Sequence, residues 1–335
     1  MTLSVHSPDE LVAVIPHLLG FKPEESIIFL PMGSDLPVAR VDLPTTPRDR
    51  EVVWRSISDA YGRYAQPGSS IAIVFLTANR EDASVAGHDF AARFDTVGID
   101  TRIMLWADET RWADLNTGDM GLQTAAARER VAAMTVLSGR AQPAPDRASL
   151  ATSLVGDREP IAKVLPDAQV AATESTTRAE SRWAVGRLNQ FHRDGLRLSD
   201  GDAARLLVAV HSIPIRDRLW EDINRDNTSS HVALWTDMTR RAPDEVRAAP
   251  ASLLGFASWL SGHGAMVWCA LDQVPEDKPY ALAGLVASAV QSGMHPREWE
   301  ATNSQPAMRG TDHAADFAPH RSDTEHVQFR PARGI

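Results

Sequence analysis

The stretch of the chain that most constrains its fold is residues 7–32, which read SPDELVAVIPHLLGFKPEESIIFLPM. Ser7 can cap a helix, Pro8 suits the first helical position, and Glu10 lies where a capping box returns its carboxylate. Apolar residues then recur at helical spacing as far as Gly20, which favours a left-handed helix end. Residues 27–30, IIFL, form a short apolar run typical of a buried strand. The stretch therefore predicts a capped helix and a buried strand, but it identifies no reaction.

The chain continues with alternating strand and helix patterns. Residues 33–37 suit a hairpin turn, so we expect the strand at 38–43 to run antiparallel to the first strand. The further elements expected are a helix at 47–65, a strand at 70–77, a helix from 77 or 79 to 98, a strand at 101–106, a short edge strand at 111–115 and a helix at 122–137. Strands separated by helices are typical of parallel pairs with right-handed crossovers. The predicted fold class is α/β, with a Rossmann-like sheet, mixed but mostly parallel, and covering helices.

The pattern changes at residues 138–147, SGRAQPAPDR, which contain few apolar residues. Beyond them only helical spacing is found, at residues 178–192, 199–211, 215–223, 231–242, 251–261, 265–273 and 280–292. From about residue 303 the chain is polar, and we expect it to be disordered. The predicted domains are an α/β domain at 1–137, a linker at 138–150, a helical domain at 151–302 and a disordered tail at 303–335.

The helices of the second half are separated by proline or glycine, as in stacked helical hairpins. Four residues are spaced somewhat as in a tetratricopeptide repeat: Trp259, Gly262, Ala270 and Pro275. The gap from Gly262 to Ala270 is shorter than that motif requires, so the likeness is loose. It favours a surface that contacts a protein, with Trp235 and Trp299 as candidates for partly exposed anchors.

The N-terminal segment also carries a family resemblance. Residues 7–32, followed by Ala39-Arg40-Val41-Asp42-Leu43-Pro44, resemble the family known as domain of unknown function 4192, found in bacteria with high-GC genomes. The similarity runs to about residue 300, and the family implies no activity. Many members resemble one another in a cysteine-containing segment, but residues 112–121 here read WADLNTGDMG. A metal or redox role implied by relatives is therefore unsupported in this chain.

Composition limits the function classes. The net charge of −10, with 44 acidic and 34 basic residues, disfavours broad binding to nucleic acid or to acidic lipid surfaces. Cys269 is the single cysteine, so no disulfide can form within the chain. The sequence starts MTLSVHSPDE and contains no apolar run of the roughly twenty residues that a membrane helix needs. We therefore expect a cytoplasmic protein.

Known catalytic motifs are missing from the sequence. It contains no G-x-S-x-G elbow, no phosphate loop, no H-E-x-x-H and no G-x-G-x-x-G after a strand. His88 and Asp89 form a dipeptide seen in some metal sites, but a pair on a helix surface explains them better. Three tail histidines lie near acidic residues, His313, His320 and His326, at a spacing that preforms no metal geometry. We assign no catalytic residue and no metal ligand, and the cofactor is unknown.

The best candidate site comes from topology. Ligands of open parallel sheets bind beyond the carboxyl ends of the strands, near helix N-termini. The side chains that follow those ends are Asp42, Thr45, Thr46, Thr77, Asn79 and Asp108. Arg40 joins them because it lies two residues before Asp42, on the same face of the strand. The alternative interpretation is that the threonines and Asn79 only cap helices and that Arg40 and Asp42 form a structural ion pair.

Two hypotheses follow for the function. The first is a cytoplasmic interaction or regulatory protein, with an α/β scaffold or ligand-sensing domain and a helical domain that contacts a protein partner. The second is an enzyme that acts on a small polar or phosphorylated substrate at the carboxyl edge of the sheet. The missing motifs favour the first hypothesis.

Overall fold

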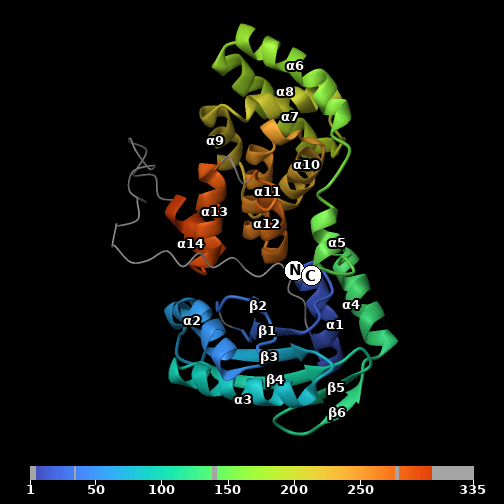
Figure 1. The fold of residues 1–335 in the computed structure, drawn as a ribbon, viewed down its shortest axis with the longest axis vertical. Helices are drawn as coiled ribbons and strands as arrows, with labels where there is room; N and C mark the ends of the chain where they lie inside the picture. The colour runs from blue at the N-terminus through green and yellow to red at the C-terminus, as the bar shows by residue number, and fades with distance from the viewer. Residues whose placement is uncertain (1–4, 34, 138–141, 276–278, 304–335) are drawn as a thin grey trace. The chain divides into compact units, whose positions relative to one another are not determined.

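A computed structural model describes residues 5–33, 35–137, 142–275 and 279–303. Within these ranges the chain is a mixed α/β protein with fourteen α-helices and a six-stranded sheet (Figure 1). It divides into two compact units, residues 1–296 and 297–335. Most of helix α14 (Pro296–Asn303) lies in the second unit, and every other named helix and strand lies in the first. The predicted tail at 303–335 lies almost entirely outside the described residues.

Helix α1 (Pro8–Leu19) and strand β1 (Ser26–Pro31) occur where the opening stretch predicts them. The helix ends at Gly20, whose φ of 81° is left-handed and whose N–H donates to the Pro16 carbonyl. The predicted capping box forms differently, because the Glu10 carboxylate accepts from the N–H of His6 at 2.9 Å, one residue before the cap. Residues on both sides of Ser7 therefore fix the start of this helix.

The sheet has the strand order β2-β1-β3-β4-β5-β6. The other strands are β2 (Ala39–Asp42), β3 (Ser70–Leu76), β4 (Asp100–Ala107), β5 (Arg111–Asp114) and β6 (Met120–Leu122). Only β3 and β4 pair in parallel, and the other four neighbouring pairs are antiparallel. The prediction of a mostly parallel sheet is therefore wrong, because β1 lies between β2 and β3 and runs opposite to both. For the same reason β2, β3 and β4 share one direction, and their carboxyl ends lie at one edge of the sheet.

Helices cover both faces of the sheet. Helices α2 (Pro47–Tyr64) and α3 (Arg80–Thr96) cover one face, where Phe29 packs edge-on against Tyr61, Phe90 and Phe94. Two alternate residues of β2, Ala39 and Val41, pack against this core, and so does Leu43 just beyond the strand. Helix α1 covers the other face through Val12 and Ile15. The first core therefore depends on aromatic packing, and the second on aliphatic packing.

Four apolar residues of the opening stretch differ in their burial. Ile28 is fully buried and Leu30 is 6% exposed, whereas Leu18 and Leu19 at the end of α1 are half-buried. Leu18 and Leu19 nevertheless pack against the core that α1 forms with the sheet.

From residue 125 onward every named element is a helix. These elements are α4 (Ala125–Leu137), α5 (Arg147–Thr152), α6 (Glu159–Glu174), α7 (Thr177–Asp194), α8 (Asp200–Ala209), α9 (Ile213–Glu221), α10 (Thr228–Arg241), η1 (Asp244–Val246), α11 (Ala248–Leu260), α12 (Gly264–Leu271) and α13 (Ala281–Gln291). Helices α5 and α6 were not predicted, and α5 begins inside the proposed linker 138–150. Helix α11 is buried from Ala249 to Leu260 and packs against α10, α12 and α13. It is therefore the central helix of this group.

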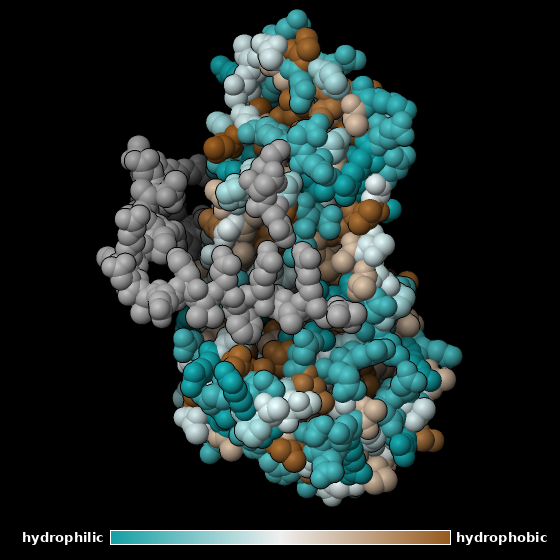
Figure 2. All heavy atoms as spheres, in the orientation of Figure 1, coloured by the Kyte–Doolittle hydropathy of each residue, from teal (hydrophilic) through white to brown (hydrophobic). Residues whose placement is uncertain are grey.

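Apolar residues occur both along the helices and on the surface of the molecule. No helix among the described residues is long and apolar enough to cross a membrane. On the face drawn in Figure 2, hydrophobic residues form small groups among hydrophilic ones. Scattered exposed apolar residues are normal for a folded domain.

Candidate functional site

The predicted site at the carboxyl edge of the sheet consists of residues that bond mainly to near neighbours. Asn79 caps α3 by accepting from the N–H groups of Glu81 and Asp82, and Thr46 caps α2 by accepting from that of Asp49. Asp108 accepts from the N–H groups of Thr110 and Arg111. Burial opposes ionisation, but these bonds outweigh it and lower the pKa of Asp108 to about 2. Thr45 is exposed beside them.

Thr77 differs from these caps because it joins two strands. Its hydroxyl donates to Glu25 at 2.7 Å, and the N–H of Ala78 donates to the same carboxylate at 3.3 Å. Glu25 has a φ of 40°, a left-handed value that is uncommon for a residue other than glycine. The bond therefore holds the strained entry to β1 against the end of β3.

Arg40 and Asp42 form the predicted ion pair at 2.7 Å, but Asp42 is not buried: 86% of its side chain is exposed. Arg40 also donates from Nε and Nη2 to the Ser26 hydroxyl, at 3.0 and 2.7 Å, and its guanidinium lies 5.8 Å from the ring centre of Phe21. Arg40 thus has other partners besides Asp42. Ligand binding by the residues of this edge stays a prediction.

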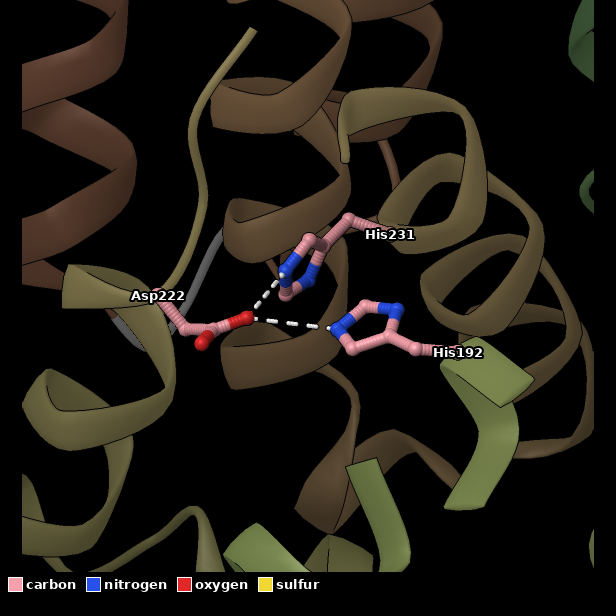
Figure 3. Close-up of side chains that lie close together, drawn as sticks. All are labelled: His192, Asp222 and His231. Carbon is pink, nitrogen blue, oxygen red and sulfur yellow. Dashed lines mark hydrogen bonds and ion pairs between the residues drawn. The ribbon is translucent and has the colours of Figure 1, made fainter. Parts of the chain in front are cut away.

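A second cluster of polar side chains, His192, Asp222 and His231, lies in the helical half (Figure 3). His192 belongs to the last turn of α7, Asp222 follows the end of α9, and His231 lies in the first turns of α10. The Asp222 oxygen Oδ2 is 3.2 Å from His192 Nε2 and 3.0 Å from His231 Nε2. One carboxylate oxygen therefore joins three helices.

The short loop between α9 and α10 fixes this carboxylate. Asn227 donates from Nδ2 to the carbonyl of Asp222 at 2.8 Å and to its Oδ2 at 3.2 Å. Asn224 and Asn227 bond to neighbouring backbone groups of the same loop. Such side-chain turns are typical of asparagine and aspartate. They set the position of Asp222 before any contact with the other helices.

Trp235 fixes the position of one proton in the cluster. Its indole N–H donates to His231 Nδ1 at 3.2 Å, and an indole nitrogen cannot accept. In neutral His231 the proton therefore lies on Nε2, which donates to Asp222. An ionised carboxylate accepts only, so neutral His192 also donates from Nε2, and its Nδ1 lone pair faces the Ser230 hydroxyl at 2.7 Å. All hydrogen bonds of the cluster then have one consistent direction.

The electrostatics agree with this arrangement. His231 is fully buried, and burial lowers its pKa although Asp222 acts in the opposite direction. Hydrogen bonds from His231 and then from His192 lower the pKa of Asp222 against its partial burial. A neutral His231 beside an ionised Asp222 is therefore the favoured state near neutral pH.

Two histidines and a carboxylate are also a donor set for zinc or ferrous iron, and their ligand atoms lie within 4.8 Å of one another. A metal on His231 Nε2 would move the proton of that ring to Nδ1, where it would meet the N–H of Trp235 head-on. Ligating histidines need an acceptor at their second nitrogen, and Trp235 offers a donor. The cluster therefore fits protons better than it fits a metal.

The sequence analysis missed this cluster and misplaced Trp235. Trp235 is fully buried and not a partly exposed anchor. His231, Leu234, Trp235 and Met238 are all buried and recur at helical spacing along one face of α10, which is the signal that places His231 in the core. The distances of 30 and 9 residues that separate Asp222 from its histidines follow no motif. In the dipeptide His88-Asp89, His88 is exposed on α3, whereas Asp89 is half-buried and pairs with Arg50 of α2 and Arg93 of α3.

A hollow of about 560 Å³ lies between α7 and α9. Its lining residues are Thr177, Arg178, Ser181, Arg182, Val185, Pro214, Ile215 and Arg218. Three of these carry positive charge and none is acidic. Within the described part of the chain Arg178 and Arg182 form no ion pair, whereas Arg218 pairs with Glu221 at 3.3 Å. We call this feature the arginine-lined hollow.

Comparison with known proteins identifies the family and no more. A family model described as a domain of unknown function (DUF4192) matches residues 8–297. The chain therefore belongs to this family, as the resemblance predicted. No curated protein and no solved structure matches it.

Proposed function

We propose that this member of the DUF4192 family is a cytoplasmic interaction or regulatory protein whose helical half binds an acidic segment of a protein partner. The observation that carries the proposal is the arginine-lined hollow, where three arginines stand without an acidic lining residue. Arginine is enriched in interface hot spots, and its planar group binds carboxylates with two parallel hydrogen bonds.

The net charge of the whole chain also bears on how an acidic partner would bind. A chain with a net charge of −10 repels acidic partners in general, so a local group of arginines directs such a partner to one place. Val185, Pro214 and Ile215 add apolar area to the same lining. The hollow therefore suits a segment that alternates acidic and apolar residues better than it suits free phosphate. The α/β half would then act as a scaffold or as a ligand sensor.

The test uses a fluorescent peptide of glutamate and leucine, with a lysine and leucine peptide of the same length as a comparison. Fluorescence anisotropy with the full chain should detect the acidic peptide and not the basic one. Replacing both Arg178 and Arg182 by alanine should weaken binding at least about tenfold, since each charge-assisted contact contributes about 1.5–3 kcal/mol.

The matched control is the double variant Arg48→Ala/Arg128→Ala, which removes the same charge from the exposed surfaces of α2 and α4. It should bind the acidic peptide within about twofold of the wild type, because the residual effect is long-range and screened. Equal weakening in both double variants, or equal binding of both peptides, would refute a specific role for the hollow.

One observation favours the enzyme alternative at the edge of the sheet. Backbone strain at a residue such as Glu25 occurs often at functional sites, and Glu25 lies among the carboxyl ends of the strands that share one direction. A small polar or phosphorylated substrate there would have to displace the bond between Thr77 and Glu25. Calorimetric titration with phosphate, comparing wild type with Thr77→Val, would detect such a site.

A further inference from the structure

We propose that Ser230 is a nucleophile, with His192 as its general base and Asp222 as the group that positions His192, and that it reacts with carboxylic esters. This inference goes beyond the proposed interaction role and does not depend on it. The observation that carries it is the hydrogen-bond chain from Ser230 through His192 to Asp222, with distances of 2.7 and 3.2 Å.

The direction of this chain is what activation of a serine requires. The Asp222 carboxylate accepts a hydrogen bond from the N–H at Nε2 of His192. Nδ1 of His192 therefore carries the lone pair that accepts the hydrogen bond from the Ser230 hydroxyl. The bond from Ser230 reaches Nδ1 here and the bond to the carboxylate uses Nε2. The two ring nitrogens can exchange these roles, since the chemistry depends only on one nitrogen donating and the other accepting.

The surrounding residues hold the aspartate in place. Asp222 receives His231 Nε2–H at 3.0 Å and the Asn227 amide at 3.2 Å, so its carboxylate is fixed independently of His192. Trp235 orients His231 by donating a hydrogen bond from its indole N–H to Nδ1, the ring nitrogen that does not contact Asp222. A carboxylate oriented in this way keeps the imidazole of the base in one tautomer, which is the main task of an aspartate in such a chain.

The reacting end of the chain is within reach of solvent. His192 and Asp222 keep 19% and 40% of their side chains exposed, and Ser230 is half-buried. Ser230 also lies in the first turn of α10, where the helix dipole favours the negative charge that develops during attack. Trp235 and His231, by contrast, are fully buried and cannot touch a substrate.

The step balances with water as the only co-reactant. Ser230 Oγ forms a bond to the ester carbonyl carbon while its proton moves to His192 Nδ1. The bond between that carbon and the alkoxy oxygen then breaks, and His192 returns the proton to the leaving alcohol. Water, deprotonated by His192, attacks the acyl-serine, and the carboxylic acid leaves as Ser230 regains its proton.

The test treats the full chain with a fluorophosphonate, which modifies activated serines by losing fluoride, and maps the labelled peptide by mass spectrometry. We expect modification of Ser230 and none of Ser229, its exposed neighbour on the same helix. This comparison is made within one wild-type molecule and therefore does not depend on the folding of a variant. No label on Ser230, or equal labels on both serines, would overturn the proposal.

Variants separate chemistry from structure. His192→Gln should slow the labelling of Ser230 at least about a hundredfold, the lower end of the range for general base catalysis. Ser230→Ala removes one oxygen and should abolish hydrolysis of p-nitrophenyl butyrate above background, while Ser229→Ala should leave it unchanged. Unchanged labelling in folded His192→Gln, or hydrolysis that survives Ser230→Ala, contradicts the proposal. So does a zinc titration that shows a tight site lost in His231→Gln, because such binding would reverse the proton order of the cluster.

Discussion

The edge of the sheet and the His192 cluster both gather polar side chains, but they gather them over different distances along the chain. At the sheet edge most partners lie two or three residues apart, as in Asn79 with Glu81 and Asp108 with Arg111. In the cluster, Ser230 and Asp222 reach His192 across 38 and 30 residues. Bonds of the first kind satisfy a loop or a helix end. Bonds of the second kind connect helices that lie far apart in the sequence.

The first prediction removes the buried tryptophan behind the cluster. Trp235→Ala should lower the free energy of unfolding by about 3–5 kcal/mol, because it removes a large, fully buried side chain and leaves a cavity. Chemical denaturation gives the value. Trp112→Ala, at a half-buried position on β5, is the comparison and should cost clearly less. Equal losses would mean that the cluster is no more dependent on packing than the edge of the sheet.

The second prediction removes the shared carboxylate. Asp222→Ala should cost about 1–3 kcal/mol, because the buried N–H of His231 loses its acceptor. Urea denaturation at pH 7 measures this loss. In the double variant Asp222→Ala/His231→Leu, the unpaired donor is gone and part of the stability should return. A double variant as unstable as the sum of the two single changes would show that the two residues do not interact.

The third prediction concerns acid. Burial lowers the pKa of His231 in the folded chain, so below about pH 6.5 the unfolded chain binds more protons and stability falls as the pH falls. The lowered pKa of Asp222 acts at lower pH, where its stabilising contribution is lost as the pH falls below about 3.8 toward its folded value.

Between pH 7.5 and 5.5 we therefore expect His231 to account for a loss of about 1 kcal/mol, within the limit of about 1.4 kcal/mol per pH unit for one proton. The measurement compares the pH dependence of urea midpoints in wild type and His231→Gln, which share all other histidines. A variant curve as steep as that of the wild type would contradict the assignment.

The fourth prediction is the smallest and concerns the sheet edge. Asp42→Asn should change the free energy of unfolding by less than about 1 kcal/mol, because the side chain is 86% exposed and Arg40 keeps its bonds to Ser26. A thermal melt in low and high salt measures it. A loss as large as that of Asp222→Ala would erase the difference between the two regions.

The same difference explains what the sequence could predict. The caps at Thr46 and Asn79 were predictable, because a cap needs only the N–H groups of the following turn. The position of β1 between β2 and β3 was not predictable. The order of strands depends on which strand pairs with each edge of β1, and the apolar pattern of IIFL does not specify this. Helix α6 carries Pro166 in its interior, which disguises its period. The cluster of His192, Asp222 and His231 forms where three helices pack together, so no local sequence pattern predicts it.

The position of β1 between β2 and β3 makes residues 26–31 the link between the edge strand β2 and the rest of the sheet. Among the residues that the structure describes, β2 pairs with β1 and not with β3, so it joins the sheet through β1. A fragment that starts after Pro31 would lack β1 but retain every other strand. In such a fragment β2 would have lost the strand with which it pairs. During synthesis β1 is the first of the strands to be made. Its pairing with β3 can form only after Ser70 has been made, 44 residues after Ser26. Residues 26–31 therefore form a link that precedes in the sequence both of the strands that it joins.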